Sequence, residues 1–121
     1  MTRLLADANM SHRFVAACIR LERDFPLLHI ADWMSGRHRM SQDLVLLQIL
    51  REQDMVLVSF DRRSIAMHAG QLTREGLGHA GVILFRRIVS QLDYGKQSRS
   101  MVTFWGEARN WDWTDRIEYL P

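Results

Sequence analysis

Short apolar runs alternate with amphipathic segments along the chain. The runs at 3–6, 27–30, 55–59 and 80–85 are mostly apolar, which is typical of strands buried on both faces of a sheet. Between the first two runs, apolar residues recur at helical spacing from Phe14 to Leu21. Alternating strands and helices predict an α/β chain with a three-layer α/β/α fold and a mostly parallel central sheet.

Polar and breaker residues set the expected ends of the helices. Ser11 is a candidate N-cap for the first helix, which should end near Asp24, shortly before Pro26. Ser41 should open the second helix. The remaining elements are expected to be a short helix at 64–69, a polar stretch at 70–79, a helix between 93 and 108, and a last strand within 113–120 at the sheet edge.

Length and composition indicate one globular domain over residues 1–121. The hydrophobic share of 47% is too high for a disordered chain, and no apolar run approaches the ~20 residues of a membrane helix. The single cysteine, Cys18, cannot form an internal disulfide and falls on an apolar helical face, which predicts a buried, inert thiol. With no signal-peptide pattern at the start, these features favour a soluble, cytoplasmic protein.

The basic residues are unusual in kind. The net charge is only +2, yet Lys96 is the only lysine among 16 basic residues. Arginine can grip phosphate with two parallel hydrogen bonds, so Arg62-Arg63, Arg86-Arg87 and the trio 37–39 could contact a nucleic-acid backbone. A GC-rich genome would produce the same bias, so these clusters only support other evidence.

Three acids stand where metal chemistry would need them. Asp7 and Asp61 follow apolar strands, and Asp43 lies in the first turn of the helix before the third strand. Carboxylates that converge where parallel strands end suit Mg²⁺ or Mn²⁺, which could activate water against a phosphodiester. Asp7, Asp43 and Asp61 are therefore the candidate catalytic and metal-binding residues.

Each acid also has a structural alternative. Asp7 could cap a turn through its own backbone, although a carboxylate at the end of a buried strand needs a partner. Asp61 could be the N-cap of a helix over 62–69, a role compatible with metal binding. Asp43 could simply complement the dipole of its helix.

Nearby polar residues are candidates for substrate binding. Asn9 could orient a phosphate or act as a turn amide, and Ser59 could hydrogen-bond the metal shell or face a loop. Arg62 and Arg63 could grip phosphate. The five histidines lack metal-binding spacing and receive no catalytic role, and the tryptophans are expected in the core or at the sheet edge: Trp105, Trp111 and Trp113.

Four segments together resemble a known family. Residues 4–11 (LLADANMS), 29–32 with 41–44 (HIAD, SQDL), 56–61 (VLVSFD) and 79–83 (HAGVI) are similar, in order and spacing, to motifs of the small bacterial PIN-like proteins. The resemblance covers roughly residues 3 to 90. It implies a PIN-like fold related to toxin ribonucleases of toxin–antitoxin pairs, which cut RNA with clustered acids and Mg²⁺ or Mn²⁺.

By position, the resemblance carries the metal-site roles onto Asp7, Asp43 and Asp61, and implies RNA, an antitoxin protein and a second copy of the chain as partners. Two departures matter. Arg63 stands where the family usually has a second acid after Asp61, and Ala8 replaces an acid that often follows the first one. An ion pair between Arg63 and Asp61 would argue for an inactive site.

Three functions are consistent with these residues. The first is a metal-dependent ribonuclease, in particular the toxin of a toxin–antitoxin pair. The second is a catalytically inactive module that binds RNA or a protein partner. The third is a receiver-like phosphoacceptor domain with Asp61 as acceptor, which Ala8 beside Asp7 and the position of Lys96 oppose.

Overall fold

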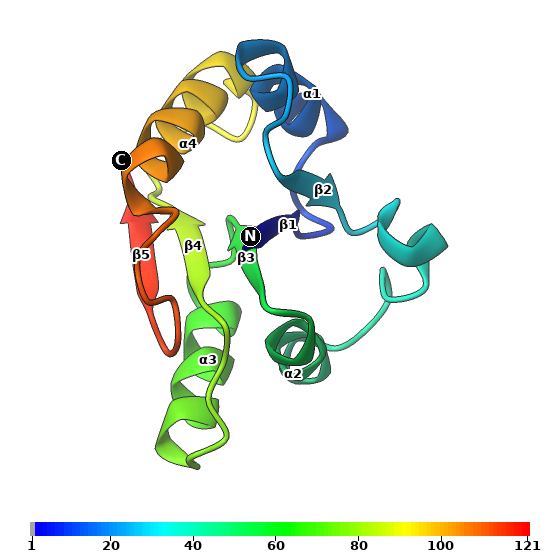
Figure 1. Cartoon of the computed structure of the whole chain (residues 1–121), viewed down its shortest axis with the longest axis vertical. Helices are drawn as coiled ribbons and strands as arrows, with labels where there is room; N and C mark the ends of the chain where they lie inside the picture. The colour runs from blue at the N-terminus through cyan, green and yellow to red at the C-terminus, as the bar shows by residue number, and fades with distance from the viewer. Residues whose placement is uncertain (1) are drawn as a thin grey trace.

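The computed structural model describes residues 2–121 and confirms the predicted α/β class (Figure 1). Its sheet is parallel throughout, which is more regular than the mostly parallel sheet that we expected. In chain order the elements are β1 (Arg3–Ala6), α1 (His12–Leu21), β2 (Leu27–His29), the 3₁₀ turn η1 (Trp33–Gly36), α2 (Asp43–Gln53), β3 (Met55–Ser59), α3 (Ser64–Arg74), β4 (Val82–Phe85), α4 (Tyr94–Ala108) and β5 (Ile117–Leu120).

The five strands follow the order β2-β1-β3-β4-β5. The chain winds one way from β1 to β2 and the other way from β3 to β5, so the order reverses between β1 and β3. Open parallel sheets bind ligands outside the carboxyl ends of their strands at such a switch point. The register pairs Ala6 with Val58, and the next residues, Asp7 and Ser59, therefore lie side by side.

Helices cover both faces of the sheet and create two hydrophobic clusters. Leu4 and Val58 belong to the cluster under α1 and α4, whereas Leu5 and Leu57 belong to the cluster under α2 and α3 (Figure 1). Burial on both faces explains why the strands are continuously apolar. Within residues 2–121, none of the helices combines the length and apolar character needed to cross a bilayer.

The first helix follows its sequence signals. The Ser11 side chain accepts a hydrogen bond from the Arg13 amide, so the predicted N-cap is confirmed. Cys18 is fully buried as predicted, and burial raises the pKa of its thiol to about 12. Because the thiolate is the reactive form, this cysteine is inert at neutral pH.

The third helix is longer than predicted. It runs to Arg74, five residues beyond the expected end at 69. Gly70 does not end it because the buried side chain of Leu72 anchors the next turn in the core. The helix stops just before Gly76, which has a φ of 76°.

Two other boundaries also differ from the prediction. The second helix begins at Asp43 after Gln42, and the Ser41 amide instead donates to the His38 carbonyl. The last strand covers only Ile117–Leu120, at the edge of the sheet as expected. Trp113 lies in the core, where its indole N–H donates to the Ala108 carbonyl.

Gly81 allows Trp113 to pack against the start of β4. Gly81 has a φ of 115°, and an added Cβ would lie 2.8 Å from the Trp113 ring and 3.0 Å from its carbonyl oxygen. A residue with a Cβ is therefore strongly disfavoured at this position.

We expect Gly81→Ala to lower the free energy of unfolding by about 2 kcal/mol, because the added Cβ would meet the Trp113 ring and the backbone conformation disfavours alanine. Urea denaturation measures this change.

Gly106 provides the matched control. It lies in α4, and nothing comes within 4 Å of an added Cβ. Gly106→Ala should raise stability by about 0.5–1 kcal/mol because alanine favours the helix. Equal effects of the two substitutions would contradict the role given to Gly81.

Candidate functional site

Asp7 is the central residue of the candidate site. It follows β1 at the switch point and is only 9% exposed. Its Oδ1 accepts a hydrogen bond from the Ala8 amide at 2.8 Å, and its Oδ2 accepts one from the Ser59 hydroxyl at 3.1 Å. The Asp7 amide also donates to the Val58 carbonyl, so the pairing of β1 with β3 fixes this residue at both backbone and side chain.

Ser59, the last residue of β3, connects three parts of the site. Its hydroxyl oxygen accepts hydrogen bonds from the Asp61 amide at 3.0 Å and from Asn9 Nδ2 at 3.3 Å, while it donates to Asp7. Asn9 Oδ1 in turn accepts from the Phe60 amide. Ser59 is fully buried, and its hydroxyl group holds the Asp7 carboxylate in position.

Asp43 and Asp61 meet at the start of α3. Asp61 Oδ1 accepts from the Ser64 amide at 2.9 Å, and Asp43 Oδ2 accepts from the Ser64 hydroxyl at 2.8 Å. Asp43 is the first residue of α2, and Ser64 is the first residue of α3. The positive ends of both helix dipoles therefore lie beside the acids, which favours negative charge there. Asp43 thus lies where it complements the dipole of α2, as predicted. Asp61 is not the N-cap that we expected, because α3 begins at Ser64 after Arg63, but its carboxylate still accepts from the first amide of that helix.

The three acids are close enough to affect one another. Burial raises the pKa of Asp7 above its ordinary value, the hydrogen bonds from Ala8 and Ser59 oppose that shift, and the charges of Asp43 and Asp61 add to it. The charged form of Asp7 is therefore costly in this site. A bound cation or a proton would relieve that cost.

A preformed cage of protein ligands is absent from residues 2–121: no group of three or more Asp, Glu, His or Cys side chains is arranged to hold a metal ion. Mg²⁺, however, usually retains several waters and takes only one or two carboxylates together with substrate phosphates. The negative charges around Asp7 fit such a hydrated ion. They do not fit a metal that needs three or four protein ligands.

A basic cavity adjoins the acids. It has a volume of about 480 Å³ and is lined by Phe60, Asp61, Arg62, Arg63 and Arg87. Arg62 Nη1 donates to the carbonyls of Phe60 and Phe85, which fixes this side chain across the ends of β3 and β4.

Arg63 does not neutralise Asp61. The only ion pairs among residues 2–121 join His12 to Asp32 and Arg116 to Glu118, so the pairing that would have argued for an inactive site does not form. Arg63 is exposed, and in residues 2–121 none of the three arginines that line this cavity forms an ion pair. Arg87 was noted in the sequence only as part of a basic pair, and its place beside Asp61 depends on the pairing of β3 with β4.

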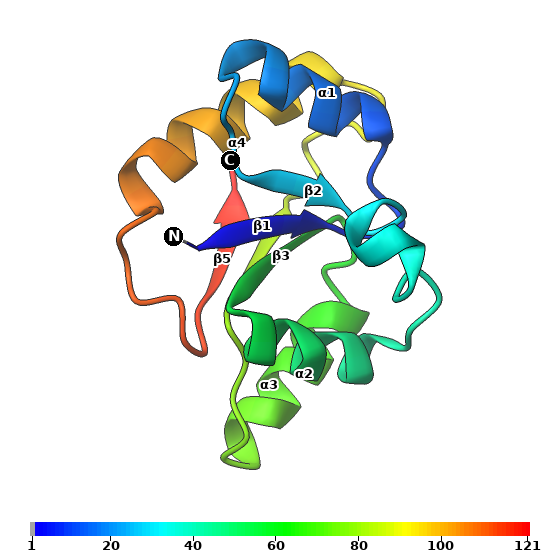
Figure 2. The same cartoon turned by 45° about the vertical axis from the view of Figure 1, so that its right-hand side comes forward.

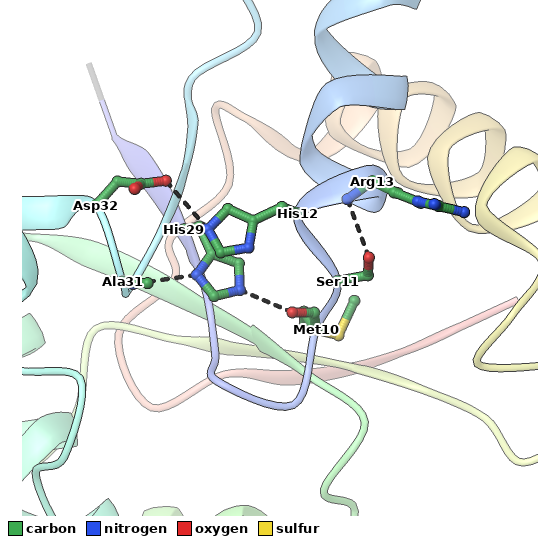
Figure 3. A network of polar contacts seen from close by, with 7 residues as sticks. All are labelled: Met10, Ser11, His12, Arg13, His29, Ala31 and Asp32. Carbon is green, nitrogen blue, oxygen red and sulfur yellow. Dashed lines mark hydrogen bonds and ion pairs between the residues drawn. The ribbon is translucent and has the colours of Figure 1, made fainter.

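A histidine pair at the end of β2 was not predicted (Figure 3). His29 is buried, its Nε2 lies 2.7 Å from the Met10 carbonyl oxygen, and its Nδ1 accepts from the Ala31 amide. His12 stacks on it with ring centroids 3.8 Å apart and lies 3.3 Å from Asp32. Both nitrogens of His29 are used, so the pair fastens α1 to β2 and leaves no free ligand atom on the buried ring.

No protein-family model matches the chain, and neither a curated protein nor a solved structure matches it. Membership of the PIN-like family therefore stays a prediction from the four sequence segments. The functional assignment depends on the geometry of the site.

The raised pKa of Asp7 predicts that this residue lowers stability at neutral pH. We expect Asp7→Asn to raise the free energy of unfolding at pH 7 by about 1 kcal/mol, because Asn can still accept from Ala8 and can donate to Ser59 without a buried charge. The folded state binds the Asp7 proton more tightly than the unfolded state, so the advantage of Asn should shrink as the pH falls through the folded pKa towards 3.8.

Urea denaturation at a series of pH values measures this effect. Asp24→Asn is the matched control, since Asp24 is an exposed acid in the turn after α1. If Asp7→Asn destabilised the protein at pH 7 or showed the same pH dependence as the control, burial of a charged Asp7 would not be a source of strain.

Proposed function

We propose that the protein is a metal-dependent ribonuclease of PIN-like type that acts in the cytoplasm as the toxin of a toxin–antitoxin pair. The observation that carries the proposal is the buried Asp7 at the switch point, with the charges of Asp43 and Asp61 close enough to raise its pKa. Each neighbouring negative charge makes it harder to ionise Asp7, and carboxylates whose pKa values are shifted in this way cluster at functional sites.

Each residue has a distinct role in this proposal. Asp7 would be the main ligand of Mg²⁺ or Mn²⁺, and Asp61 and Asp43 would complete the set of protein ligands. The bound ion would supply charge neutralisation at the scissile phosphate and a more acidic water. Ser59 and Asn9 keep Asp7 in place.

The basic cavity supports a substrate that contains phosphate. Arg62, Arg63 and Arg87 surround the space next to Asp61, and guanidinium groups match the geometry of phosphate oxygens. Such a cavity would draw the phosphate of an RNA strand towards the acids. An antitoxin protein and a second copy of the chain are the proposed protein partners, as the PIN-like resemblance implies.

The direct test is cleavage of an unstructured RNA in the presence of Mn²⁺. We expect the parent protein to cleave, Asp7→Asn to lose about 10²-fold in rate, and Ser59→Ala to lose about 10-fold because Asp7 loses its orienting hydrogen bond. Rates are measured from the length distribution of labelled products over time.

Asp24→Asn is again the control and should cleave like the parent. Chelation of the metal should abolish cleavage and its restoration should recover it. If Asp7→Asn cleaved as fast as the parent, the ribonuclease proposal would be wrong, and a catalytically inactive module that binds RNA or a protein would take its place.

One observation favours a second candidate, a receiver-like phosphoacceptor. The strand order β2-β1-β3-β4-β5 is that of the flavodoxin-like fold, which receiver domains also adopt. Against it, Ala8 stands beside Asp7 where a second acid is needed, and Lys96 lies in the first turn of α4 and not after β5.

Phosphoryl transfer distinguishes the two candidates. After incubation with acetyl phosphate and Mg²⁺, we expect the mass of the intact protein to stay unchanged, because the Asp61 carboxylate accepts from the Ser64 amide and the single lysine lies in α4 and not after β5. Stoichiometric phosphorylation that Asp61→Asn removes would favour the receiver-like function instead.

A further inference from the structure

A second basic cavity lies between α1 and α4, on the face of the sheet opposite α2 and α3. It has a volume of about 490 Å³ and includes Arg13 and Arg20 from α1 and Arg99 from α4. Small residues form much of its lining, among them Ala16, Ala17 and Gly95. The cavity is therefore a groove between two helices, with cationic side chains along it.

Residue spacing explains the groove. Arg13 and Arg20 are seven residues apart, which places them on the same face of α1 and about 10 Å apart along its axis. Ala16 and Ala17 lie between them on that face and leave room above the helix. On α4, the Arg99 guanidinium lies over Gly95, where an added Cβ would come within 3.0 Å of Nη1.

The charge of the groove is unbalanced. Its lining contains three arginines and no carboxylate, and Tyr94 adds a half-buried aromatic ring with a hydroxyl group. Among residues 2–121, none of these arginines takes part in an ion pair. The Asp93 carboxylate lies near the Arg99 end of the groove, where it accepts a hydrogen bond from the Lys96 amide and forms no ion pair with Arg99. The three arginines therefore leave a net positive charge along the groove, which an anionic ligand would balance.

The cavity extends along α1 and over the first turns of α4, because residues from Arg13 to Leu21 line it together with residues from Tyr94 to Arg99. Both helices begin beyond the carboxyl ends of the strands that precede them, and they pack against each other on one face of the sheet (Figure 2). His12 at the start of α1 stacks on His29 at the end of β2, and α4 begins shortly after β4. Arg13, in the first turn of α1, therefore marks the end of the cavity that is nearer to the carboxyl ends of the strands.

We propose that the groove between α1 and α4 binds the phosphate backbone of a single-stranded RNA, with Arg13, Arg20 and Arg99 contacting successive parts of the strand. The inference rests on the proposed function for its choice of RNA. Successive arginines along one groove suit a repeating anion, and Tyr94 can stack on a base. A second copy of this chain would bring the same cations against themselves.

The test is binding of a fluorescently labelled 12-nucleotide oligouridine, followed by anisotropy in the presence of EDTA so that no cleavage occurs. We expect Arg20→Gln and Arg99→Gln each to weaken binding by about 3- to 10-fold. The slope of log affinity against log salt concentration should fall by about 0.7 for each phosphate that the variant no longer neutralises. Arg74→Gln, an exposed change at the far end of α3, is the matched control and should alter neither quantity.

Competition identifies the kind of ligand. Tripolyphosphate should displace the RNA, and the same charge concentration of polyglutamate should displace it less. If polyglutamate bound more tightly than RNA and depended on Arg20 and Arg99, an acidic protein segment would be the occupant and the RNA assignment would be overturned. Unchanged affinity and salt slope in both arginine variants would also overturn it.

The outcome is separable from that of the ribonuclease test. The binding assay in EDTA lacks the metal that cleavage requires, and Asp7 is not among the residues that line the groove, so the effects of the arginine variants are read independently of the acidic site. Loss of binding in the arginine variants, without cleavage by the parent protein, would support the groove and refute the nuclease. Cleavage that depends on Asp7 but not on Arg20 or Arg99 would support the nuclease and refute the groove.

Discussion

The hydrogen bond between the Ser59 hydroxyl and the Asp7 carboxylate is the interaction on which the candidate site depends. It joins β1 to β3 where the strand order of the sheet reverses, and it involves a hydroxyl with no exposure to solvent. The same hydroxyl accepts from Asn9 and from the Asp61 amide, so a single side chain sets the position of the loops after both strands. Without it, Asp7 would keep its buried location and lose the partner that makes the location tolerable.

Opposing electrostatic effects meet at this point. Burial and the neighbouring charges of Asp43 and Asp61 disfavour a negative Asp7, whereas hydrogen bonds from Ala8 and Ser59 favour it. The starts of α2 and α3 supply further partial positive charge. Together these effects raise the pKa of Asp7, so the ionised carboxylate is disfavoured when no cation is bound. Carboxylates disfavoured in this way are common where a protein binds a cation or moves a proton. The arginines around Asp61 place complementary charge within reach without pairing with it.

Local patterns are sufficient to predict most of the fold. The apolar runs predict the strands, Ser11 predicts the start of the first helix, and Asp7 and Asp61 directly follow the runs that form the neighbouring strands β1 and β3. The errors arose where tertiary packing decides: Leu72 carries α3 past Gly70, and the last strand begins only at Ile117 because Trp113 packs into the core before it. The roles of Ser64 and His29 could not be predicted, because their partners lie 21 and 19 residues away in sequence and meet only in the folded chain.

The hydrogen bond between Asp7 and Ser59 spans 52 residues of sequence. Parallel pairing over such a separation requires closure of a long loop before the two strands can meet, and it forms late compared with local helices. A nascent chain that has released β1, α1 and β2 thus carries Asp7 without the rest of its surroundings. The candidate site forms only when β3 has paired with β1, so an incomplete or partly unfolded chain lacks the assembled site.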